Sequence, residues 1–337
     1  MTAPAEAAET RGAVPAIDSA ARAAAPILPD GLFGYIAATC WLHQVPLVAI
    51  TVAVFLLEVV PLELQRRVVN DVVKHRPYGA VVLLGAAYAG AVLVQGATKL
   101  ALNLYRAWVG ERAKRDLRRR IHASLAATGA RTSSDEAHGT AVSMLVAEVE
   151  PIGGFVGTSV SEPLLQAGIL GTVIAYIIHL DPWMGAAALA LFVPQLVFVP
   201  LMQHAMNRRT GARVWLLRQI GIRVIAGGAP EAADAARIDR VFRLNMGIFT
   251  LKFTMNLLMN LCSHMQVVSA LLLGAWWVLQ GNLEIGGVVA FISGVTRLND
   301  PWGDLVNYFR ELSVTRVKFR LLADAIARWH PSAARAW

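Results

Sequence analysis

Charged residues are scarce in this sequence. Only 16% of its 337 residues are Asp, Glu, Lys or Arg, whereas soluble domains carry about 25%. Hydrophobic residues make up 56% of the chain, and its mean hydropathy is +0.50. This composition excludes an ordinary soluble domain, so we expect an integral membrane protein surrounded by lipid.

Cysteines are equally few, and the usual catalytic motifs are missing. Cys40 and Cys262 stand in separate apolar stretches with no partners at metal-ligand spacing, which excludes a disulfide framework and a zinc site of the familiar kinds. The sequence contains no HExxH motif and no Ser/His/Asp order typical of a hydrolase. We therefore predict that the chain holds no metal and has no catalytic residues of its own.

Basic residues outnumber acidic ones, which gives a formal net charge of +8 and a pI near 9.9. In a multi-pass membrane protein such an excess usually marks cytoplasmic loops, so we expect no binding of nucleic acid. The first 30 residues are rich in Ala and Pro and lack the apolar core of a signal peptide. We predict a disordered cytosolic tail over 1–30, a transmembrane domain over 31–328 and a cytosolic tail over 329–337.

Apolar runs of the length that a bilayer requires, roughly 20 residues, occur six times. A short interfacial helix over 32–43 precedes the first of them. The predicted spans are 45–64, 78–104, 164–180, 183–206, 249–279 and 285–305. The fold class we predict is all-α, a bundle of six transmembrane helices.

Several of these runs continue as charged helical sequence without a break. Residues 78–127 would form a helix of about 75 Å, more than twice the thickness of a bilayer core. The fourth run continues through Arg208 to Arg218, and the fifth is preceded by Arg237, Arg240 and Arg243. By the positive-inside rule we place these extensions and both termini in the cytoplasm, with the chain in the inner membrane.

Ionisable residues inside the sixth run are candidates for function because charge is costly at membrane depth. Arg297, Asp300 and Asp304 share one helical face. They could line a wet cavity, or they could close on one another as a local ion pair. Glu58 lies deep in the first run, where Arg297 is a candidate partner.

The fifth run carries Asn256, Asn260 and His264 at intervals of four residues, which places them on one face. Two interpretations stay open: the stripe lines a transport pathway, or it forms hydrogen bonds between helices. Lys99, near the inner end of the second run, is interpreted as an interfacial anchor.

Two sequence motifs, one after the second predicted span and one before the sixth, resemble motifs of a known family. The run GERAKRDLRRR over Gly110–Arg120 resembles the signature at the inner end of the second helix of ABC exporters. The run GNLEIGGVVAF over Gly281–Phe291 resembles the turn that opens their sixth helix. The two motifs, the long helical extensions and the short turns at the opposite ends of the helices together make the chain resemble the transmembrane domain of an ABC exporter.

This resemblance implies a permease subunit that pairs with a second transmembrane subunit, as a homo- or heterodimer, around a cavity that opens to alternate sides. It also implies coupling helices at the tips of the extensions. By position these fall in Gly129–Gly139, with Arg131, Asp135 and Glu136, and in Ala226–Ala236, with Pro230, Glu231 and Asp234.

An ATP-binding domain needs a GxxxxGK[ST] loop whose backbone cradles the phosphates, and the sequence has no Gly-Lys pair. We therefore expect ATP and Mg²⁺ to be bound by a separate ATP-binding subunit and no cofactor to be bound here. The rival hypothesis is an ion- or proton-coupled secondary transporter, or a channel, in which Glu58, Arg297 and Asp300 carry the coupling charge.

Overall fold

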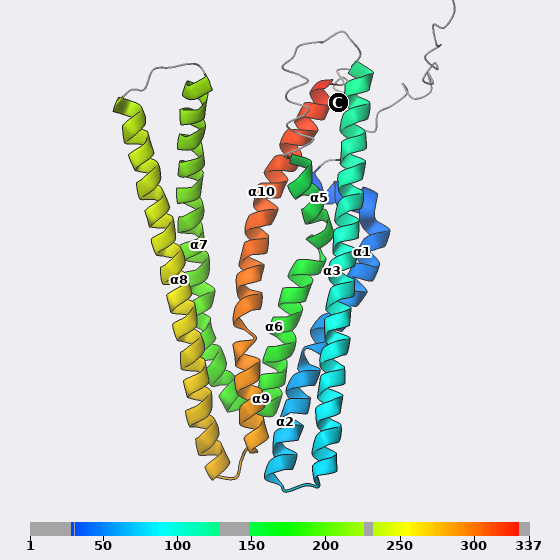
Figure 1. Ribbon diagram of the computed structural model, residues 1–337, viewed down its shortest axis with the longest axis vertical. Coiled ribbons are helices and arrows are strands. Elements are labelled where there is room, and N and C mark those ends of the chain that lie inside the picture. The colour runs from blue at the N-terminus through cyan, green and yellow to red at the C-terminus, as the bar shows by residue number, and fades with distance from the viewer. Residues whose placement is uncertain (1–27, 30, 129–147, 226–231, 330–337) are drawn as a thin grey trace, which may run out of the picture. The chain divides into compact units, whose positions relative to one another are not determined.

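The computed structural model describes residues 28–29, 31–128, 148–225 and 232–329. Within these ranges the chain is helical and contains no strand, which confirms the all-α prediction (Figure 1). The helices are α1 (Leu32–Leu57), α2 (Val59–Val73), α3 (Tyr78–Thr128), α5 (Val149–Thr158), α6 (Ser161–Leu180), α7 (Pro182–Ile225), α8 (Ala232–Leu279), α9 (Ile285–Thr296) and α10 (Asn299–Trp329).

Three helices are much longer than a bilayer core. α3 has 51 residues, α7 has 44 and α8 has 48, or roughly 65–77 Å at 1.5 Å per residue. No proline occurs within α3 or α8, so nothing interrupts their backbone hydrogen bonds. The predicted continuity of apolar runs into charged helix is confirmed for all three.

The beginning of the chain differs from the prediction. We expected an interfacial helix over 32–43 and a separate span over 45–64, but α1 runs without a break from Leu32 to Leu57 and contains Pro46. An internal proline removes one backbone hydrogen bond and does not always end a helix. The break comes later, at Glu58, three residues before Pro61.

The sixth predicted run is also broken. α9 ends at Thr296, and α10 begins at Asn299. Pro301 has no N–H to donate to the carbonyl of Arg297, and its ring would clash with that carbonyl in a continuous helix. Five helical segments of the described chain are long and apolar enough to cross a membrane: Leu32–Val73, Tyr78–Ser124, Ser161–Leu180, Pro182–Leu217 and Ala235–Leu279.

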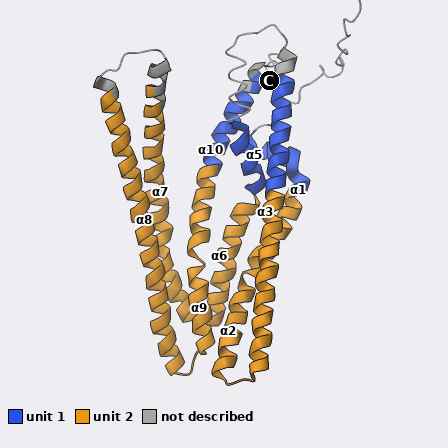
Figure 2. Ribbon diagram, viewed as in Figure 1, with its two compact units in different colours: residues 1–43, 107–158, 312–337 blue, residues 44–106, 159–311 orange. Residues whose placement is uncertain are grey.

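The chain divides into two compact units (Figure 2). Unit 1 comprises residues 1–43, 107–158 and 312–337, and unit 2 comprises residues 44–106 and 159–311. In unit 2, α7 packs against α8, α2 against α9, and α9 against α8. Arg209 of α7 donates to the carbonyl of Gly247 on α8 at 2.5 Å, which ties this helix pair together.

Unit 1 has a small core of its own. Val109, Leu117 and Ile121 of α3 are fully buried, as is Phe155 of α5. Tyr35 of α1 is also fully buried, and its hydroxyl donates to Asp116 Oδ2 at 2.9 Å. The ring of Tyr35 lies 5.6 Å from that of Phe319 on α10. Unit 1 is therefore held by apolar packing around a buried tyrosine.

Candidate functional site

A cleft of about 420 Å³ lies in unit 2 and is lined mainly by charged and polar side chains. Its lining includes four of the residues that the sequence singled out, Glu58, Arg297, Asp300 and Asp304. The other lining residues are Lys99, Arg106, Glu162, Leu165, Gln166, Ile169 and Pro301. So many ionisable groups among spanning helices make this cleft the candidate site.

Glu58 is at the centre of the cleft's ion pairs. Its side chain is only 7% exposed, and its Oε2 lies 2.6 Å from Nη1 of Arg297. The same nitrogen donates to the backbone carbonyl of Glu58 at 3.2 Å. Lys99 Nζ reaches the other carboxylate oxygen at 3.1 Å. One buried carboxylate therefore binds two cations, and the candidate contact between Glu58 and Arg297 is present.

The two helix breaks of unit 2 meet at this pair. Glu58 is the residue between α1 and α2, and Arg297 follows the last residue of α9. Arg297 donates to the backbone carbonyl of Glu58, so the side chain at one break contacts the backbone at the other. The prolines that break the helices and the ion pair that joins them thus form one local structure.

Arg106 of α3 forms a second group of contacts in the cleft. Its Nε donates to Ser161 Oγ at 2.8 Å, and its Nη1 lies 2.7 Å from Glu162 Oε2. Its side chain is 9% exposed, and Nη2 has no hydrogen-bond partner among the described residues. Gln166 bridges this group to α10, because its amide nitrogen donates to Glu162 at 2.7 Å and to Asp304 at 3.3 Å.

Asp300 and Asp304 are less constrained. Both are exposed, both line the cleft, and neither forms an ion pair with a cation in the described part of the chain. Arg297 pairs with Glu58 rather than with these neighbours, so the local ion pair considered from the sequence is not the one that forms. If the sixth predicted run crosses the membrane, these exposed carboxylates require water or a polar partner, which the cleft can provide.

The polar stripe of α8 lies elsewhere. Asn256, Asn260 and His264 are exposed side chains on that helix, and they are not among the residues that line the cleft. The candidate coupling residues Arg131, Asp135, Glu136, Pro230 and Glu231 fall outside the described residues, and for Asp234 only the helical backbone is described.

The sequence analysis missed four polar members of the cleft. Lys99 had been interpreted as an interfacial anchor, whereas it binds Glu58. Arg106 is not among the candidate residues of the sequence analysis, and neither are Glu162, two residues before the predicted span 164–180, and Gln166, inside that span. The four-residue spacing of Glu162 and Gln166, which puts them on one face of α6, was the available signal.

Within the described residues, no group of three His, Cys, Asp or Glu side chains is placed to hold a metal ion.

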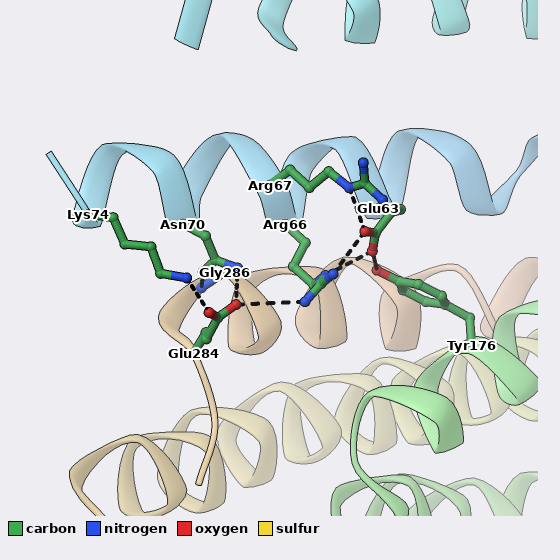
Figure 3. A network of polar contacts seen from close by, with 8 residues as sticks. All are labelled: Glu63, Arg66, Arg67, Asn70, Lys74, Tyr176, Glu284 and Gly286. Carbon is green, nitrogen blue, oxygen red and sulfur yellow. Dashed lines mark hydrogen bonds and ion pairs between the residues drawn. The ribbon is translucent and has the colours of Figure 1, made fainter. Parts of the chain in front are cut away.

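A separate polar network joins α2 to the beginning of α9 (Figure 3). Glu284, the residue before α9, accepts from Lys74 Nζ and Asn70 Nδ2, each at 2.5 Å. The Oδ1 of Asn70 accepts from the backbone N–H of Gly286 at 2.8 Å. Asn70 therefore caps α9 from a neighbouring helix and satisfies one of the N–H groups that a helix start leaves unpaired.

The same network continues along α2. Arg66 donates through Nε and Nη2 to the two carboxylate oxygens of Glu63, both at 2.8 Å, and Arg67 donates to Glu63 at 2.7 Å. The hydroxyl of Tyr176, on α6, donates to Glu63 at 3.1 Å (Figure 3). The contact of Tyr176 with Glu63 joins α2 to α6, and the contacts of Asn70 join α2 to the beginning of α9.

Comparison with known families decides what kind of protein carries this cleft. Residues 47–212 match the family model of the ABC transporter transmembrane region. This part of the chain is similar to the transmembrane region of ABC transporters. No curated protein matches it.

The matched ABC transporter region begins within α1 and ends within α7. It contains Glu58, Lys99, Arg106, Glu162 and Gln166, so more than half of the cleft's polar lining belongs to it. Arg297, Asp300 and Asp304 complete the cleft from outside the match. With its several apolar helices, the chain is a multi-pass membrane protein that is similar to the ABC transporter transmembrane region over residues 47–212.

Proposed function

We propose that this chain is the permease subunit of an exporter-like ABC transporter and that it moves its substrate with ATP hydrolysed by a separate nucleotide-binding subunit. The observation that carries the proposal is the charged cleft, because most of its polar lining falls in the matched ABC transporter region. The match to an ABC transporter transmembrane region supports an ATP-binding partner, and the proposal places ATP and Mg²⁺ on that partner.

A second transmembrane subunit is part of the proposal. Asn256, Asn260 and His264 are exposed on α8 within a segment long and apolar enough to span the membrane. Polar side chains facing lipid are unfavourable, and such groups usually meet another helix or a water-filled cavity. A partner subunit facing α8 supplies either environment, which supports a homo- or heterodimer around a shared pathway.

The proposed working cycle uses the junction of Glu58 and Arg297. Helix breaks allow the segments on each side to change their angle, and here two breaks are joined by one ion pair. Tilting of α2 against α1, and of α10 against α9, would separate the pair and open the cleft. ATP binding on the partner subunit would drive this change through Arg131, Asp135 and Glu136 at one tip and Pro230, Glu231 and Asp234 at the other.

A gradient-coupled secondary transporter is the second candidate. The exposed carboxylates of Asp300 and Asp304 in the cleft favour it, because acidic residues at membrane depth often carry protons or ions. The family match favours the ATP-driven mechanism, so the gradient-coupled mechanism is the alternative that an experiment must exclude.

The experiment is affinity purification of the tagged chain in mild detergent, followed by an ATPase assay on the recovered complex. The proposal predicts recovery of a nucleotide-binding polypeptide with vanadate-sensitive hydrolysis. Charge reversal at Asp135 and Glu136, or at Glu231 and Asp234, should lower that hydrolysis, whereas reversal at Glu311 on α10 should not. Recovery of the chain as an oligomer without ATPase activity would reject the proposal and favour the gradient-coupled alternative.

A further inference from the structure

One face of α3 in unit 1 carries an unusual set of basic side chains. Trp108, Arg112, Arg115, Arg119 and His122 follow one another at intervals of four and three residues, so they lie along one side of the helix. All five are exposed, and they line a surface recess of about 570 Å³ together with Glu111 and Arg118. We call the five residues the arginine face.

The opposite side of the same helix is fully buried. Val109, Ala113, Leu117 and Ile121 are 0% exposed and form part of the unit 1 core. This packing fixes the rotation of α3, so the arginine face must point outwards. Its orientation is set by the fold rather than by the flexible basic side chains themselves.

Carboxylates of the described residues pair with the cations beside the arginine face but not with its arginines. Lys114 contacts Glu111 and Glu150, Arg118 contacts Glu150, and Arg120 contacts Asp116. In the described part of the chain, no carboxylate forms an ion pair with Arg112, Arg115 or Arg119. Like charges at these spacings repel on a helix, so an external anion would stabilise this surface.

Apolar side chains beside the arginine face indicate the kind of anion. The ring of Trp108 lies 4.9 Å from that of His43 on α1, and Arg112 stacks 5.6 Å from the Trp108 ring. Next to His43 in the sequence, Trp41 and Leu42 are 64% and 80% exposed. Exposed tryptophan beside arginine is typical of the boundary between the hydrocarbon and the headgroups of a bilayer.

We propose that the arginine face binds the phosphate of an anionic phospholipid, with the acyl chains beside Trp41, Leu42 and Trp108. Guanidinium groups pair with phosphate through two parallel hydrogen bonds. Basic residues at the membrane surface attract anionic headgroups and do so less strongly as salt is added. Neither the family match nor the charged cleft assigns this site.

The test measures lipid binding to the purified full-length chain in neutral detergent by native mass spectrometry, with phosphatidylglycerol and phosphatidylcholine as probes. We expect phosphatidylglycerol to bind at least about tenfold more tightly than phosphatidylcholine, and this preference to shrink at high salt. The triple variant R112Q/R115Q/R119Q should lose at least about tenfold in affinity for phosphatidylglycerol and none for phosphatidylcholine.

The matched control is R240Q/R243Q/R320Q, which removes three exposed arginines from other helices and should change phosphatidylglycerol binding by less than about threefold. The charge-preserving variant R112K/R115K/R119K should retain more of the binding than the glutamine variant, because lysine keeps the charge but not the paired guanidinium hydrogen bonds. This difference separates loss of charge from misfolding. Unchanged phosphatidylglycerol binding in the triple glutamine variant, or equal losses in the control, would overturn the proposal. Unchanged lipid binding with loss of a co-purifying polypeptide would instead assign the arginine face to a protein partner.

Discussion

The side chain of Arg297 contacts both the backbone and the side chain of Glu58. One guanidinium nitrogen, Nη1, lies 2.6 Å from the carboxylate Oε2 of Glu58 and 3.2 Å from its carbonyl oxygen. Each residue stands at the end of a helix that a following proline interrupts. The contact therefore joins two backbone breaks that are 239 residues apart in the sequence.

The losses of stability caused by replacing Glu58 and by replacing Arg297 should be energetically coupled. We expect E58Q and R297Q each to lower the stability of the chain by about 1–3 kcal/mol, because each leaves a partly buried charge without its partner. The double variant should lose less than the sum of the two. Apparent melting temperatures of the four proteins in one detergent measure the coupling, and strictly additive losses would contradict the pairing.

The close approach of α2 and α9 makes Gly286 sensitive to any added side chain. A Cβ atom at this position would run into the carbonyl oxygen of Arg66 and the side chain of Asn70. We expect G286A to destabilise the chain by about 1–3 kcal/mol through overpacking. The control G303A, where a Cβ atom would meet nothing within 4 Å, should be neutral or slightly stabilising. Equal melting temperatures for the two variants would show that the helices are not packed in this way.

Asn70 should matter for a different reason. It is 8% exposed and is the hydrogen-bond partner of both the Gly286 N–H and the Glu284 carboxylate. We expect N70A to cost about 1–3 kcal/mol, because a buried donor loses its partner. Hydrogen exchange at the first turn of α9 should accelerate in N70A but not in R67A, since Arg67 contacts only Glu63 in this network.

Stability should depend on pH through Glu150 of α5. Hydrogen bonds from Lys114 and Arg118 lower the pKa of Glu150 from its usual value of 4.5. Because the pKa of Glu150 is lower in the folded state than in the unfolded state, its ionised carboxylate stabilises the folded state above pH 4.5. This stabilisation is lost as the pH falls through the pKa of Glu150 in the folded state. The melting temperature of E150Q should therefore lie below that of the wild type at pH 7, by a small amount because Glu150 is half exposed.

The difference between E150Q and the wild type should narrow as the pH falls below 4.5 and through the lowered pKa of Glu150 in the folded state. E311Q is the matched control, because it removes a carboxylate from an exposed position on α10. A difference in melting temperature that stayed constant as the pH fell from 7 to well below 4.5 would contradict the role of the Glu150 ion pairs.

The long helices could be predicted from the sequence, but the positions at which other helices break could not. α3 and α8 lack internal proline and carry uninterrupted helical sequence, so their length followed from the pattern. Pro46 and Pro61 lie in the same apolar run, yet only the second accompanies a break. Which proline ends a helix depends on whether neighbouring helices satisfy the freed carbonyl, and that is a tertiary property.

The candidate site was likewise predicted in part. Glu58, Arg297, Asp300 and Asp304 stood out because charge is rare in apolar runs, and all four line the cleft. Arg106 and Glu162 were hidden because they lie where apolar sequence gives way to polar sequence, and charges are ordinary there. Only the folded structure brings Arg106 and Glu162 into contact and into the same cleft as Glu58.

The effects of the cleft's carboxylates on transport can be separated from their effects on folding. Under the proposed mechanism, D300N and D304N should alter ATP turnover of the purified complex while leaving its melting temperature within about 1 °C of the wild type, because neither carboxylate forms an ion pair in the described chain. The comparison variant E58Q should change both properties. A loss of stability in D300N equal to that in E58Q would assign Asp300 a structural role.

The central claim is that ATP bound by another subunit drives this chain, and vanadate-sensitive ATPase activity of the affinity-purified complex tests it most directly. The account predicts a co-purifying nucleotide-binding polypeptide whose hydrolysis falls when Glu231 and Asp234 are replaced by lysine and stays unchanged when Glu311 is. Purification of the chain as a stable oligomer with no ATPase activity, and with transport driven by an imposed proton gradient, would contradict it.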